Sequence, residues 1–207
     1  MPRTARKIVD GGLYHIINRG NAQQTIFRKE QDFQSFADLL ANMAQTYQVE
    51  IFAWCLMSNH YHLVVKPVNA EQLSKGMHWF QSTHVRRYHR HYGSSGHLWQ
   101  GRYKSYAIEG DEHFLAVIRY VEANPLRANM VKSAADWTWS SHRRRLGTGS
   151  AGDCPNAENE GDSPFMEEGL SPCVKLTALP IELPQPWTDY VDMPMTEAEI
   201  FKVRNKV

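Results

Sequence analysis

The sequence is poor in cysteine, and its few cysteines follow no recognised spacing. Cys55, Cys154 and Cys173 are an odd number in a chain of 207 residues, and no two of them form a CxxC pair. A disulfide scaffold or a cysteine-rich zinc site needs more cysteines at regular intervals, so neither is expected. The cysteine content therefore indicates a reducing compartment.

Long apolar runs are also missing. No stretch of eighteen apolar residues occurs, so the sequence predicts no membrane span. Residues 1–12 are basic but lack an apolar core, so no secretory signal is expected. Apolar residues make up 42% and charged residues 22%, which is typical of a globular protein. A chain of this length has room for one domain and an appendage.

The net charge of +1 conceals an uneven distribution. Residues 1–147 contain 19 Lys and Arg against 11 Asp and Glu, a balance of +8, whereas residues 148–207 contain 4 against 11, a balance of −7. A basic body favours a polyanionic partner such as nucleic acid. The acidic remainder is either a solvated spacer or a segment that competes with DNA for the basic surface.

Apolar spacing and turn signals predict the element order β-α-β-β-α-β. This order is typical of the ferredoxin-like (RRM-like) α+β fold, with a four-stranded antiparallel sheet and both helices on one face. The predicted strands are residues 13–19, 49–57, 60–66 and 97–109, and the predicted helices are residues 29–48 and 70–92. The other face of the sheet is then left for a functional site.

A third helix is predicted from Asp111 to Asn124, because Pro125 disfavours its continuation. Tyr120 and Asn124 are one turn apart and lie on one face of this helix. On the local pattern alone, the favoured interpretation is that Tyr120 is an ordinary amphipathic helix residue and that Asn124 is a C-terminal cap.

Three regions follow from composition. Residues 1–147 are predicted to be the folded body, with Trp137 and Trp139 in its core and the arginines of residues 143–145 solvated. Residues 148–169 are a flexible acidic linker. Residues 170–207 are a C-terminal tail, extended as far as residue 194, with a short helix opened by the capping-box sequence at Thr196.

Two histidines lie immediately after a predicted hairpin turn. Ser58 and Asn59 form the turn, and His60 and His62 begin the return strand. Alternation along a strand places both imidazoles on the same face, where they could bind one divalent cation. A pair of polar residues on a solvated sheet face is the alternative, because His-x-His alone is a weak signal.

Three motifs together resemble the single-tyrosine HUH transposases, and in particular the REP-associated tyrosine transposases. They are YHIINRGN (residues 14–21), WCLMSNHYHLVVKP (residues 54–67) and GHLWQGRYKS followed by YVEANP (residues 96–105 and 120–125). The resemblance covers roughly residues 10–145. It implies that His60 and His62 are the paired metal ligands, that Tyr120 is the nucleophile, and that Asn124 completes the metal site.

The implied reaction is the metal-dependent cleavage and rejoining of single-stranded DNA at REP-type hairpins. A tyrosine phenol, with an ordinary pKa of about 10, is a poor nucleophile at neutral pH unless Mg²⁺ or Mn²⁺ polarises the scissile phosphate. The product would be a 5′-phosphotyrosine and a free 3′-OH. The resemblance also implies a bacterial, cytoplasmic, nucleoid-associated protein that acts as a monomer or dimer.

The DNA contacts are expected on the basic body. Basic and polar side chains would bind phosphates, and an aromatic ring would stack on a base. The candidates are Arg19, Asn21, Arg86, Arg87, Arg90, Trp99, Arg102 and Lys104, with Tyr103 as a second stacking candidate.

Two other functions remain open from the sequence. One is a non-catalytic, RRM-like nucleic-acid-binding protein, which would expose aromatic rings on its central strands. The other is a metal-dependent nuclease that uses water, with Tyr120 in a structural role.

Overall fold

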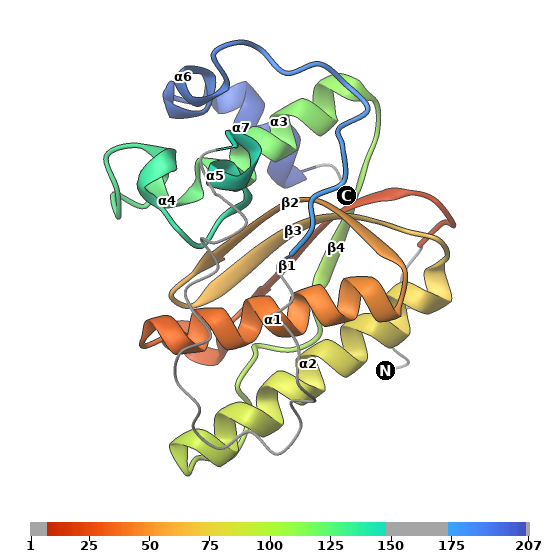
Figure 1. Cartoon of the computed structure of the whole chain (residues 1–207), viewed down its shortest axis with the longest axis vertical. Coiled ribbons are helices and arrows are strands. Elements are labelled where there is room, and N and C mark those ends of the chain that lie inside the picture. The colour runs from red at the N-terminus through yellow and green to blue at the C-terminus, as the bar shows by residue number, and fades with distance from the viewer. Residues whose placement is uncertain (1–7, 148–173, 206–207) are drawn as a thin grey trace.

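Four strands form one antiparallel sheet in the order β2-β3-β1-β4 in the computed structural model (Figure 1), which describes residues 8–147 and 174–205. This order confirms the ferredoxin-like prediction. The first three strands begin and end within one residue of their predicted bounds. The strands are β1 (Leu13–Arg19), β2 (Val49–Met57), β3 (His60–Pro67) and β4 (Lys104–Ile108).

Helices α1 (Glu30–Thr46) and α2 (Ala70–Tyr92) cover one face of the sheet. The side chain of Asn69 accepts a hydrogen bond from the backbone N–H of Gln72 at 2.9 Å and so caps the start of α2. Gly93 ends the helix in the left-handed conformation, at φ 57°. The apolar faces of both helices pack against alternate residues of the central strands, namely Tyr14, Ile16, Tyr61, Leu63 and Val65.

The opposite face is covered by α3, with the C-terminal helices packed on the outer side of α3 (Figure 1). Gly110, at φ 73°, precedes α3, and Pro125 lies in the first turn of the next short helix. The third predicted helix therefore ends close to its predicted boundary. The elements of this layer are α3 (Asp111–Glu122), α4 (Asn124–Arg127), α5 (Ser141–Arg145), α6 (Trp187–Asp192) and α7 (Glu197–Asn205); two short 3₁₀ turns are η1 (Asn21–Gln23) and η2 (Ala134–Asp136).

The outer edge of β2 is covered by segments from later in the chain. The N–H of Leu56 donates to the Trp139 carbonyl at 2.8 Å, and Cys55 forms a bridge with Ser140. Further along the strand, the N–H of Thr177 donates to the Ile51 carbonyl at 2.8 Å. An edge strand with unpaired backbone groups can recruit foreign strands, and these bonds occupy that edge.

The segment expected as a strand from residue 97 is a strand only from Lys104 onward. Trp99 makes one isolated bridge to Gly20, and the N–H of Gln100 donates to the Arg19 carbonyl at 2.8 Å. Trp99 is buried in the apolar core between the helices and the sheet. The segment therefore crosses the end of β1 as a loop, because its large aromatic side chain is drawn into that core.

Two expectations for the later residues were wrong. The segment from 170 to 194 was expected to be extended, but Trp187–Asp192 is a helix whose Trp187 and Val191 are buried. The arginine run was expected to be solvated, but Arg145 bonds to the buried Glu122. The predicted helix after Thr196 is confirmed as α7. The predicted linker 148–169 lies outside the described residues.

None of the helices within the described ranges is long and apolar enough to cross a membrane.

Candidate active site between the sheet and helix α3

Three histidines lie on the face of the sheet that α3 covers. His60 and His62 alternate with buried Tyr61 along β3, as predicted, and His15 comes from the neighbouring strand β1. The ring centroids of His60 and His62 are 5.1 Å apart, and those of His15 and His62 are also 5.1 Å apart. The fold therefore gathers three imidazoles where the sequence motif supplied only two.

Hydrogen bonds fix which nitrogen each of the two paired histidines presents. Nε2 of His15 lies 2.9 Å from Nδ1 of His62, and Nδ1 of His60 lies 2.6 Å from the side-chain oxygen of Asn59. In both rings this leaves Nε2 open to a ligand. The other nitrogen of His15, Nδ1, is buried and has no hydrogen-bond partner among the described residues.

Burial keeps these imidazoles neutral. Desolvation lowers the pKa of His15 to about 4, with a smaller contribution from His113. It also lowers the pKa of His60 to about 4, with the nearby charge of Arg19 acting in the same direction. The pKa of His62 lies well below its ordinary value, first through burial and then through His15 and His60. Neutral imidazoles are the form that can bind a metal ion.

Helix α3 places Tyr120 directly over the histidines. The ring centroid of Tyr120 lies 5.7 Å from that of His62 and 6.1 Å from that of His15, and the side chain is buried. The guanidinium of Arg127, from α4, lies 4.7 Å from the Tyr120 ring centroid. A guanidinium at this distance makes a cation–π contact that helps to hold the Tyr120 ring in place.

Asn124 follows Tyr120 by one turn and begins α4. Its side-chain N–H₂ donates to the backbone carbonyl of Tyr120 at 3.0 Å. This bond leaves the amide oxygen, Oδ1, as the atom that could bind a ligand.

The donor set fits a loosely held divalent ion better than a tight structural metal. Within the described residues there is no group of three or more His, Cys, Asp and Glu side chains that could hold a metal. Two imidazole Nε2 atoms and one amide oxygen are what remains on His60, His62 and Asn124. Such a mixed set leaves coordination positions for phosphate oxygens or water, as Mg²⁺ and Mn²⁺ require.

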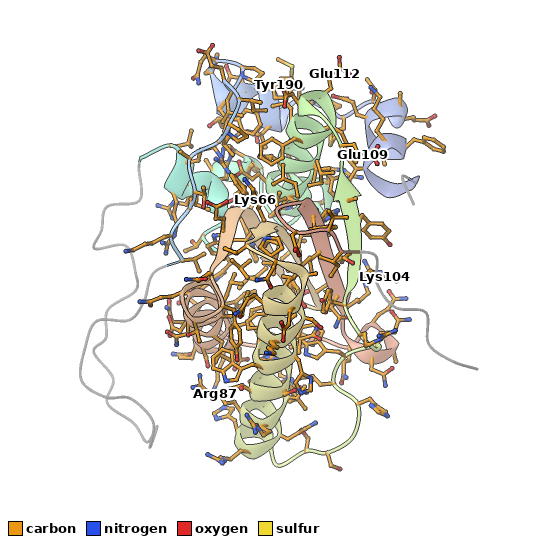
Figure 2. All side chains as sticks on the ribbon, turned by 90° about the vertical axis from the view of Figure 1, so that its right-hand side faces the viewer. Lys66, Arg87, Lys104, Glu109, Glu112 and Tyr190 are labelled. Carbon is orange, nitrogen blue, oxygen red and sulfur yellow. The ribbon has the colours of Figure 1, made fainter. Side chains whose placement is uncertain are left out.

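The predicted DNA-binding residues fall into two groups. Arg19 faces His60 across the β1–β3 pair, and Lys104 pairs with Ile17 at the start of β4. Asn21, in η1, and Arg102, in the loop before β4, are exposed. Arg86, Arg87 and Arg90 lie on α2, in the helical layer on the other side of the sheet. Figure 2 shows this separation between Arg87 on α2 and Lys104 on β4.

The two aromatic candidates for base stacking are core residues. Trp99 is 6% exposed, and its ring centroid lies 5.3 Å from that of Tyr61. Tyr103 is 5% exposed and belongs to the same apolar cluster. Neither ring is offered to a base, because both fill the space between the sheet and helices α1 and α2.

The sequence reasoning missed His15 and Arg127. A signal for His15 did exist: it alternates with Tyr14 and Ile16 in a predicted strand, so it had to face away from the helices. No comparable signal existed for Arg127, because its position over Tyr120 depends on the break between α3 and α4.

Comparisons with known proteins bear on the family and the fold of this chain. The family described as "Transposase IS200 like" matches residues 9–124. A REP-associated tyrosine transposase of Escherichia coli (strain K12) is 21% identical over 151 residues, covering 72% of this chain and 87% of that protein. The solved structure of a REP-associated tyrosine transposase bound to a REP hairpin superimposes with a TM-score of 0.58 at 18% identity, covering 86% of this chain and 100% of that one.

Proposed function

Because the chain belongs to the family of IS200-like transposases, we propose that it cleaves and rejoins single-stranded DNA with Tyr120 as nucleophile. The observation that carries this proposal is the position of the Tyr120 ring, 5.7 Å from the ring of His62. Tyr120 and the histidines come from different layers of the fold. Their convergence is what a tyrosine attack on a metal-bound phosphate requires.

The residues that would hold the divalent metal, Mg²⁺ or Mn²⁺, are His60, His62 and Asn124, through two Nε2 atoms and Oδ1. When bound, the ion would polarise the scissile phosphate and offset the charge that develops on it. The hydrogen bond that Nδ1 of His62 donates to Nε2 of His15 would hold the His62 ring in orientation, and the bond that Nδ1 of His60 donates to the side-chain oxygen of Asn59 would do the same for His60.

In the cleavage step the phenol oxygen of Tyr120 forms a bond to the scissile phosphorus. The bond between phosphorus and the 3′-oxygen breaks, the phenol proton is lost to water, and the leaving 3′-oxygen takes up a proton. One phosphodiester is exchanged for another, so a 3′-OH from a second DNA end can reverse the step without an energy source. Arg127 would hold the Tyr120 ring through its cation–π contact, and Arg19 would attract the phosphate backbone.

For the substrate we propose a REP-type DNA hairpin with an adjoining single strand. The E. coli relative is a REP-associated transposase, and the solved neighbour is bound to a REP hairpin. Arg19 pairs with His60 and Lys104 with Ile17 in the sheet, so these two residues would bind the scissile strand, with Asn21 and Arg102 as further contacts. Arg86, Arg87 and Arg90 would reach only a part of the hairpin that extends past α2.

The structure disfavours the RRM-like binding protein. An RRM stacks bases on aromatic rings of its open sheet face. Here that face holds His60 and His62, and α3 packs over it. The water-using nuclease would need the same metal ligands, but no role for Tyr120 as an attacking group.

The decisive experiment is a search for a covalent protein–DNA adduct. Single-stranded hairpin DNA labelled 3′ of the cleavage site is incubated with the protein and Mn²⁺ and run on a denaturing gel. A labelled adduct whose phosphate maps to Tyr120 supports the proposal. Cleavage without an adduct supports the water-using nuclease, and hairpin binding without cleavage supports the RRM-like protein.

A further inference from the structure

A buried carboxylate two residues after Tyr120 joins three helices. Glu122 is 0% exposed, and its Oε1 accepts hydrogen bonds from the Ser141 hydroxyl at 2.6 Å and from Nη2 of Arg145 at 2.8 Å. Its Oε2 lies 2.9 Å from Nδ1 of His142 and accepts from the indole N–H of Trp187 at 2.8 Å. Glu122 thus connects α3 to α5 and to α6.

The C-terminal segment, residues 187–205, also contacts α3 at Arg119. The guanidinium of Arg119 donates to a carboxylate oxygen of Glu199 at 2.6 Å and to the Met193 carbonyl at 3.0 Å. It also lies 4.2 Å from the ring centroid of Tyr190. Arg119 is 4% exposed and the Glu199 side chain 26%, so loss of Glu199 would leave a buried guanidinium without its charged partner.

The two contacts bracket the nucleophile. Arg119 and Glu122 are three residues apart and share one side of α3, and Tyr120, between them in sequence, faces the histidines. A helix held at both points can neither rotate about its axis nor slide over the sheet without breaking buried bonds. Cleavage is sensitive to such motion, because a misplacement of about 1 Å can cost about a hundredfold in rate.

We propose that the C-terminal segment is part of the catalytic unit and that Trp187 and Glu199 are positioning residues for Tyr120. This inference rests on the proposed role of Tyr120. It assigns the segment a function different from competition with DNA: the segment aligns the nucleophile through the outer side of α3, without contacting the scissile strand.

The test removes the indole N–H of Trp187, which donates the hydrogen bond to Glu122. Trp187→Phe keeps most of the buried apolar area and removes only the bond to Glu122. The matched control is Trp137→Phe, because the Trp137 indole also donates one hydrogen bond, to the Leu56 carbonyl at 3.0 Å, but makes it to β2 and not to α3. Each full-length variant is assayed for urea stability, hairpin affinity and single-turnover formation of the phosphotyrosine adduct.

We expect Trp187→Phe to slow adduct formation by about tenfold, with hairpin affinity within about twofold of the unmodified protein. Trp137→Phe should lose comparable stability but keep its adduct rate. Equal rates in the two variants would overturn the proposal, and so would a loss in Trp187→Phe that appears entirely as weaker DNA binding.

A second pair of variants covers the other contact. Glu199→Gln removes the charge facing Arg119, whereas Glu197→Gln makes the same change in the exposed first turn of α7. Only Glu199→Gln should lower the adduct rate. The role of Tyr120 is checked separately: if Tyr120→Phe still forms the adduct, the proposed function is wrong. If none of the four variants changes the adduct rate, only the positioning role of Trp187 and Glu199 is excluded.

Discussion

Nε2 of His15 lies 2.9 Å from Nδ1 of His62, and both rings are buried beneath Tyr120. For His62 to offer Nε2 to a metal as a neutral ligand, its Nδ1 must carry the proton and donate it to His15. The contact therefore selects one tautomer of His62 and one orientation of its ring. His15 is accordingly a candidate for tuning the metal site without touching the metal.

Removing this bond should weaken metal binding. In His15→Phe a ring of similar size remains but no nitrogen faces His62, so we expect the affinity for Mn²⁺ to fall by about 10- to 100-fold. Calorimetric titration with Mn²⁺, without DNA, measures this directly. His84→Phe is the matched control, because His84 is equally buried but lies in the helical core with Phe36 and Trp99. An unchanged affinity in His15→Phe would contradict the prediction.

Tyr120→Phe should abolish cleavage and leave hairpin binding nearly intact. The substitution removes the attacking oxygen but keeps the ring beneath Arg127 and over His62. Gel cleavage and a binding titration on the same hairpin give both quantities. Tyr47→Phe, at the end of α1, serves as control. Residual cleavage above a few per cent in the Tyr120 variant would exclude the assignment.

His60→Ala and His62→Ala should each lose metal-dependent cleavage. Each removes one of the two Nε2 atoms that the hydrogen bonds leave open on the sheet face. Raising Mn²⁺ to millimolar concentration should restore part of the activity if the loss lies in metal affinity. Crystals soaked in Mn²⁺ that show no density beside the two rings of the unmodified protein would count against this site.

His84 should make folding stability depend on pH in the acid range. Burial lowers its pKa to about 3, with Asp32 opposing this shift and Arg87 and His89 supporting it. Between that value and the unfolded pKa of about 6.5, the unfolded chain binds one proton more than the folded chain. The contribution of neutral His84 to the free energy of unfolding is therefore complete above about pH 6.5. It is lost as pH falls, by at most about 1.4 kcal/mol per pH unit.

Urea titrations from pH 7 to pH 4 measure this dependence. His84→Leu should show a shallower decline in unfolding free energy than the unmodified protein, while the other buried histidines still contribute to both. Parallel declines would show that His84 does not titrate in this way.

Deletion of everything after Leu146 should destabilise the fold. The sequence led us to expect a tail that competes with DNA, or a spacer with no docked state, and the spacer predicts no effect. In the structure Trp187 and Val191 are buried against α3. Loss of one buried tryptophan side chain alone costs about 3–5 kcal/mol, so the urea midpoint should fall sharply. A deletion variant of unchanged stability but tighter hairpin affinity would instead favour competition with DNA.

The sheet and its two helices follow from local signals. Alternating residues such as Tyr61, His62 and Leu63 define which side chains share a face, and the Ser58-Asn59 turn sets the register of the hairpin. The two metal-ligand candidates on β3 could therefore be placed on one face of the sheet from the sequence alone.

The contacts of α3 with α5 and α6 could not be predicted from local signals. His142 and Arg145 were interpreted as part of a basic surface. Nothing in the local sequence indicates that Glu122, which belongs to an earlier helix, is buried beside them. Trp187 looked like part of an extended, proline-rich stretch, since its burial depends on α3. Contacts between distant segments determine these features, and a single sequence carries no periodic signal for them.

The closure of the β2 edge has a consequence for synthesis of the chain. Its partner β3 follows it directly in the chain, but its other side is covered by residues 139–140 and by Thr177. A ribosome must therefore deliver most of the polypeptide before that edge is occupied. Until then the nascent sheet offers free backbone donors and acceptors to its neighbours, so slow translation of the last third of the gene should promote aggregation.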